Sequence, residues 1–135
     1  MWDMAVMAPR MRAVLRIVAA LIFLEHGTQK LFGFPAPSAA GLPAMFALAW
    51  FAAALELVGG LLLMVGLFTR PVAFILAGEM AFAYWIAHAP RSFFPVLNGG
   101  DAAILYCFVF LLLVFSGPGA FSLDEKRRRL PFGGM

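Results

Sequence analysis

The chain has 135 residues, of which 64% are hydrophobic and only 13% charged, with a mean hydropathy of +0.93 and a formal net charge of +3. A water-soluble domain carries about 25% charged residues, and one of this size could not hide so much apolar surface from water. The composition therefore excludes a disordered chain, a nucleic-acid-binding domain and an ordinary water-soluble enzyme. It predicts a single domain, residues 1–135, that lies in lipid.

Four apolar segments follow one another, and each approaches the length of about 20 residues that a membrane-spanning helix needs. They cover about residues 11–34, 44–68, 71–89 and 101–116. Clusters of Pro and Gly, which do not readily continue a helix, separate them. Asp101 is the expected N-cap of the fourth helix. The predicted fold class is all-α: an integral membrane, antiparallel four-helix bundle in which short loops connect the helices.

The basic residues predict how this bundle is oriented. Of the ten Lys and Arg residues, eight lie in the N-terminal flank, the second connection and the C-terminal tail, and the other two are Lys30 and Arg91. Lys and Arg accumulate on the cytoplasmic side of membrane proteins, so both termini are expected in the cytoplasm. Contact with anionic lipid headgroups would be a side effect of the same charges.

Charged side chains inside the apolar segments are the most informative feature, because each costs about 2.5 to 3.5 kcal/mol near the bilayer centre. Glu56 and Glu79 lie near the middle of the second and third segments. The outer half of the first segment carries Glu25, His26, Gln29 and Lys30. On a helical wheel these four form one stripe, which is expected to face the bundle interior. Arg16 falls on another side and is expected to snorkel to the cytoplasmic surface.

The stripe and the two carboxylates together predict a polar pocket that opens to the outer face and has Glu56 and Glu79 as its floor. Polar groups in an apolar slot with aromatic walls suit a quinone or another apolar ring compound, and carboxylates beside a histidine can relay its protons. The candidate ligand-binding or proton-handling residues are Glu25, His26, Gln29, Lys30, Glu56 and Glu79. Secondary candidates are His88, Asn98 and Asp101. The structural alternative is that Glu56 or Glu79 merely cross-links helices, for instance through Lys30 or His26.

No metal site and no resident cofactor are expected. No segment carries an E-x-x-H or H-x-x-x-H pair, and the single cysteine, Cys107, cannot form a redox pair within the chain. Any electrons would therefore come from a redox partner protein in the membrane or in solution.

Several segments resemble the signature of DoxX-type membrane proteins. They are RIVAALIFLEHGTQKLFGFP (16–35), LELVGG (55–60), GLFTRP (66–71), GEM (78–80) and NGGD (98–101). The resemblance covers about residues 13–120. It implies a four-helix protein of the bacterial inner membrane, linked to quinone-coupled oxidoreductase systems, and it assigns no catalytic role to any residue. The leading hypothesis is therefore a component of a quinone-linked oxidoreductase system.

Two alternatives to this hypothesis stay open. One is a non-catalytic structural or assembly subunit of a membrane complex. The other is a small transporter or lipid-binding protein, which four short helices would allow only through an oligomer. In each case the surroundings include membrane lipid.

Overall fold

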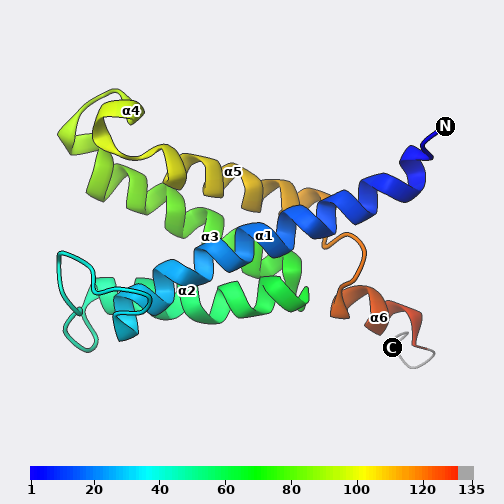
Figure 1. Cartoon of the computed structure of the whole chain (residues 1–135), viewed down its shortest axis with the longest axis horizontal. Coiled ribbons are helices and arrows are strands. Elements are labelled where there is room, and N and C mark those ends of the chain that lie inside the picture. Colours follow the sequence, from blue (N-terminus) through cyan, green and yellow to red (C-terminus); the bar gives the residue numbers. More distant parts are fainter. Residues whose placement is uncertain (131–135) are drawn as a thin grey trace.

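The computed structural model describes residues 1–130, and this part of the chain is helical with no strand, which confirms the all-α prediction (Figure 1). The long helices are α1 (Met4–Phe32), α2 (Leu48–Val65), α3 (Thr69–Ala83) and α5 (Asp101–Ser116). α3 continues through a π-helical turn, η1 (Tyr84–His88), and a 3-10 turn, η2 (Ala89–Arg91). The short helices are α4 (Pro95–Asn98) and α6 (Leu123–Arg129).

The long helices pack mainly as two pairs, α1 with α2 and α3 with α5. The N-terminus and α6 lie at one end of the molecule, and α4 lies at the other (Figure 1). We refer to these as the α6 end and the α4 end. Among residues 1–130, two helices are long and apolar enough to cross a membrane, Leu48–Val65 and Thr69–Arg91, and α5 is a shorter apolar helix. The membrane-embedded four-helix bundle and the cytoplasmic position of both termini stay predictions.

Two helix starts differ from the sequence-based bounds. α1 begins at Met4 rather than near residue 11, because the Asp3 carboxylate accepts a hydrogen bond of 2.9 Å from the N–H of Ala5 and caps an earlier turn. α2 begins at Leu48 rather than near residue 44, since Phe46 has a positive φ of 64° that a helix does not accommodate.

Small residues decide which face of α1 packs against α2. Ala13, Ala20 and Gly27 follow one another at seven-residue spacing on α1, and all three are buried. A Cβ at Gly27 would lie only 2.8 Å from the backbone nitrogen of Leu57, so the two helices approach closely there. This face is the one that also carries Arg16, and it lies away from Glu25. The expectation that the Glu25 stripe as a whole faces the interior is therefore wrong.

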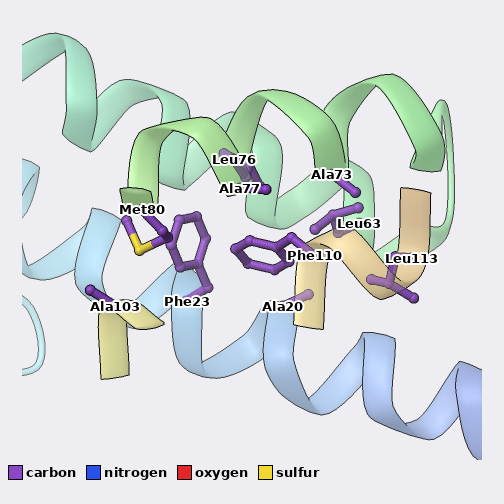
Figure 2. Close-up of a cluster of buried hydrophobic side chains, with 10 residues drawn as sticks. All are labelled: Ala20, Phe23, Leu63, Ala73, Leu76, Ala77, Met80, Ala103, Phe110 and Leu113. Atoms are coloured by element: carbon purple, nitrogen blue, oxygen red, sulfur yellow. The ribbon is translucent and has the colours of Figure 1, made fainter. Parts of the chain in front are cut away.

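The common core draws side chains from all four long helices (Figure 2). Phe23 of α1 meets Phe110 of α5 edge to face, with ring centroids 5.0 Å apart. Leu63 of α2 and Leu76 of α3 are also fully buried. The edge-to-face pair joins the α1–α2 pair to the α3–α5 pair, in addition to the contacts that α2 makes with α3.

Arg16 is fully buried at the α6 end and does not snorkel. Its guanidinium donates to five backbone carbonyls, two in the last turn of α2 and three in the segment after α5. The acceptors are Leu63 at 2.7 Å, Met64 at 3.1 Å, Pro118 at 2.9 Å, Ala120 at 3.4 Å and Phe121 at 3.0 Å. A guanidinium has five N–H donors, so each donor of Arg16 has one carbonyl acceptor. Arg16 is buried because carbonyl oxygens that lack a helical partner surround it.

Residues 117–124, which we call the closing segment, tie the α6 end together. The N–H of Ala120 donates to the carbonyl of Pro9 in α1, and the N–H of Asp124 donates to the carbonyl of Gly66 after α2, both at 2.9 Å. The Asp124 carboxylate accepts the N–H groups of Phe68 at 2.9 Å and Thr69 at 2.8 Å, so it caps the start of α3. One short stretch therefore contacts the ends of three helices.

These bonds also decide how Asp124 titrates. Partial burial acts to raise the pKa of its carboxyl, but the hydrogen bonds from Thr69 and Phe68 and the nearby charge of Arg127 outweigh it. The pKa of Asp124 is therefore lowered from its ordinary value, and the ionised form is the one that the fold stabilises.

Candidate functional site

An ion pair inside the helix assembly joins α1 to α2. Lys30 Nζ lies 2.6 Å from Glu56 Oε1, and the Glu56 side chain is only 3% exposed while that of Lys30 is 40% exposed. The second carboxylate oxygen of Glu56 is buried and has no hydrogen-bond partner within residues 1–130. The contact is one of the cross-links that the structural alternative names. Only one of the two carboxylate oxygens of Glu56 therefore has a partner in this contact.

Glu79 of α3 stands beside this pair without a partner of its own. Both of its carboxylate oxygens are buried, and neither makes a hydrogen bond within the described part of the chain. Glu56 and Lys30 are close enough to act on Glu79 electrostatically. A carboxylate that loses water without gaining a hydrogen bond is costly, by at least about 1 to 3 kcal/mol. The structure thus brings together Lys30, Glu56 and Glu79, which we call the carboxylate cluster.

The rest of the predicted stripe lies around this cluster rather than inside the core. Gln29 is half-buried, and its side-chain amide donates to the carbonyl of Ala36 at 3.2 Å, which ties α1 to the loop after it. Glu25 and His26 are exposed on the outside of α1. They face outward because the small residues that draw α1 against α2 lie on the opposite side of the helix.

Tyr106 of α5 was not among the predicted site residues, but it lies beside one of them, His26. Its ring meets His26 edge-on with centroids 6.1 Å apart and packs against Phe23 at 5.3 Å. Both Glu25 and Glu56 are near enough to act on its phenol electrostatically. Tyr106 therefore lies beside His26, with the carboxylates of Glu25 and Glu56 in its neighbourhood. No pattern in the sequence marks it, because a tyrosine in an apolar helix resembles any packed aromatic residue.

Tyr106 also lines an apolar groove between α1 and α5, with a volume of about 310 Å³. The other lining residues are Leu15, Val18, Ala19, Ile22, Ala102, Leu105 and Val109. The groove opens sideways on the apolar surface of the two helices, where a membrane would place acyl chains, and neither Glu56 nor Glu79 is part of its wall. It is a different cavity from the predicted pocket that has the carboxylates as its floor.

The secondary candidates belong to a separate network at the α4 end. Asn98 is buried, and its side chain donates to the carbonyl of Ser92 at 2.9 Å and to the hydroxyl of Tyr84 at 3.3 Å, while it accepts the N–H of Gly100 at 2.7 Å. His88 Nδ1 lies 3.1 Å from the carbonyl oxygen of Asn98. These contacts hold the connection between α3 and α5 in shape.

Asp101 does not cap α5 as predicted. Gly100 occupies the N-cap position and Asp101 is the exposed first helical residue, with no capping bond from its side chain. A carboxylate in the first turn still interacts favourably with the helix dipole. Within residues 1–130, no three His, Cys, Asp or Glu side chains lie close enough together to hold a metal ion.

The apolar helices and the polar residues among them define a helical membrane protein. A family model described as DoxX matches residues 11–89, and the chain belongs to the DoxX family. An uncharacterized protein of Haemophilus influenzae is 47% identical over 122 residues, which cover 87% of this chain and 91% of that protein. The inner membrane protein YphA of Escherichia coli is 27% identical over 135 residues, which cover 93% of this chain and 96% of YphA. No solved structure is significantly similar.

Proposed function

We propose that this protein is an inner-membrane component of a quinone-linked oxidoreductase system. It would bind an apolar ring compound in the groove between α1 and α5, where Tyr106 would contact the compound. The carboxylate cluster lies outside the groove wall and would handle protons by way of Tyr106, on which Glu56 acts electrostatically. In the same proposal the four long helices form the membrane bundle, and both termini lie in the cytoplasm. The relatives support the membrane location, since one of them is named an inner membrane protein.

The observation that carries the proposal is Glu79. Its two oxygens are buried without hydrogen bonds beside a Lys–Glu pair. A purely structural carboxylate would be expected to have partners, because an unsatisfied one destabilises the fold. A carboxyl group that gains and loses a proton during turnover must exist in both its charged and its neutral form, and a permanent ion pair would favour only the charged form.

The groove supplies the second support. Its apolar wall suits a ring compound that reaches the protein from the bilayer, and the Tyr106 phenol is the hydrogen-bonding group among its lining residues. Reduction of a quinone to a quinol consumes two electrons and two protons. Tyr106 lines the groove and would donate a hydrogen bond to the quinone. His26, whose ring meets that of Tyr106, and the nearby Glu25 lie outside the groove wall and would supply the protons. The electrons would come from a partner redox protein.

The test uses the full chain purified in a mild detergent, with a short-chain ubiquinone as the probe. We expect the quinone to raise the melting temperature of the wild type. Val18→Trp, which fills the groove, should abolish this rise, whereas Val58→Trp, a matched change on the exposed face of α2, should leave it intact. No rise in the wild type, or an equal rise in both variants, would refute quinone binding in the groove.

The second candidate function is a structural or assembly subunit. It is favoured by the exposure of Glu25 and His26 on α1, where a helix of a partner protein could cover them. The double variant Glu56→Gln, Glu79→Gln separates the two functions. A well-folded variant that assembles normally but loses quinone-linked activity supports the redox component, and one that fails to assemble with its partners supports the assembly subunit.

A further inference from the structure

The α6 end carries two adjoining basic cavities that the quinone hypothesis does not use. The larger has a volume of about 470 Å³, and its wall consists of Phe68, Thr69, Arg70, Pro71, Pro118, Asp124, Arg127 and Arg128. The second, of about 380 Å³, shares Arg70, Pro118 and Arg128 with it and adds Arg12 and Arg129 among other residues. The geometry points to a binding site for the phosphate group of an anionic membrane phospholipid, centred on Arg70 and Arg128.

The acidic residues at these cavities are already occupied. Asp124 accepts the N–H groups of Phe68 and Thr69, and Glu125 pairs with Arg129 at 2.5 Å. Arg70 and Arg128 have no carboxylate partner within residues 1–130. The cavities therefore keep an excess of positive charge, which an anionic ligand would neutralise.

The arginines are positioned in a way that leaves donors free. Arg70 donates through Nη1 to the carbonyls of Val114 at 2.5 Å and Phe115 at 2.9 Å, which fixes its guanidinium at the end of α5. Its Nε and Nη2 make no hydrogen bond within the described residues, and neither does the side chain of Arg128. Arg127 lies over the ring of Phe68, 5.1 Å from the centroid. A fixed guanidinium with free N–H groups matches the geometry of a phosphate.

The location favours a lipid over a soluble phosphate. The cavities lie where the apolar helices α2 and α5 end, so Arg70 would stand at the level of the lipid headgroups. Phe68, Pro71 and Pro118 add apolar surface to the wall beside the arginines. This combination fits a phosphodiester that carries acyl chains and lies in the bilayer.

The experiment measures the melting temperature of the full chain in a neutral detergent with added phosphatidylglycerol, phosphatidylcholine or inorganic phosphate. We expect phosphatidylglycerol to raise the melting temperature of the wild type and the other two to have little effect. If inorganic phosphate raised the melting temperature equally, the site would be one for free phosphate. If phosphatidylcholine raised it equally, the site would not distinguish an anionic headgroup from a zwitterionic one. Either result overturns the assignment.

Variants then locate the site. Arg128→Gln removes an exposed side chain that makes no hydrogen bond in residues 1–130, so folding should be unaffected. It should weaken phosphatidylglycerol binding about fivefold, since a basic residue at the membrane surface contributes about 1 kcal/mol. Arg70→Gln combined with Arg128→Gln should weaken binding further. Arg91→Gln, an exposed arginine at the α4 end, is the matched control. Wild-type affinity in Arg128→Gln would refute a site at this position.

Discussion

Replacement of Arg16 tests most directly how the α6 end is held together. The variant Arg16→Gln would remove a fully buried guanidinium whose five hydrogen bonds join α1 to the end of α2 and to the closing segment. Three of these bonds, to Pro118, Leu63 and Phe121, are 3.0 Å or shorter. A hydrogen bond from a charged donor contributes about 1.5 to 3 kcal/mol, but the burial of the charge offsets part of that gain.

We therefore expect Arg16→Gln to lower the free energy of unfolding by about 3 to 5 kcal/mol. For a chain of this size, that corresponds to a fall in the melting temperature of about 10 to 20 °C. The assay is thermal unfolding in detergent, followed with a thiol-reactive dye, because Cys107 is the single cysteine and lies half-buried in α5. Arg16→Lys should fall in between, since an ammonium has three donors.

The matched control is Arg10→Gln on the same helix. Arg10 is exposed and makes no hydrogen bond within the described residues, so its replacement should change stability by no more than about 0.5 kcal/mol. If Arg16→Gln melts at the same temperature as Arg10→Gln, the five carbonyl contacts do not stabilise the fold and the reasoning is wrong.

Three further predictions concern other contacts. Asp124→Asn should destabilise the protein by about 1 kcal/mol at pH 7. Because the folded pKa of Asp124 lies below its unfolded value, the contribution is present above about pH 4 and fades as the pH falls through the folded pKa, so melting curves of wild type and variant should converge in acid. Gly27→Val should push α1 from α2, since its Cβ would lie 2.8 Å from the nitrogen of Leu57, and the variant should melt lower than one with Ala at the same position. Lys30→Met should cost about 3 kcal/mol by leaving Glu56 buried without its ion pair, and the double variant with Glu56→Leu should recover most of the loss of unfolding free energy.

Much of the helical layout could be predicted from the sequence, because apolar runs between Pro and Gly clusters carry a strong signal. The helix starts at Met4 and Leu48 could not, since the Asp3 cap and the positive φ of Phe46 are local geometries that hydropathy does not report. The predicted helix bounds are therefore approximate at the positions where a helix extends beyond its apolar run or begins inside it.

The candidate site was predictable only in part. The helical wheel separates Glu25 from Arg16, but the prediction that the Glu25 side faces the interior is wrong, because the opposite side of α1 packs against α2. The sequence does contain a signal for the packed side of α1: the small residues Ala13, Ala20 and Gly27 at equal spacing. Arg16 lies on the same side, so this signal predicts that Arg16 is buried. The proximity of Glu56 to Glu79 and the position of Tyr106 beside His26 follow from how the helices pair, which no local pattern encodes.

The closing segment has a consequence for biosynthesis. It follows all four long helices in the chain, yet it supplies the carbonyls of Pro118 and Phe121 to Arg16 and the carboxylate that starts α3. While the ribosome still holds this stretch, the guanidinium in the first helix lacks three of its five acceptors, so the α6 end of the helix assembly is incomplete. The α6 end should therefore reach its final arrangement only after translation has passed residue 124, and a chain shortened before that point should be less stable and more sensitive to proteases at this end.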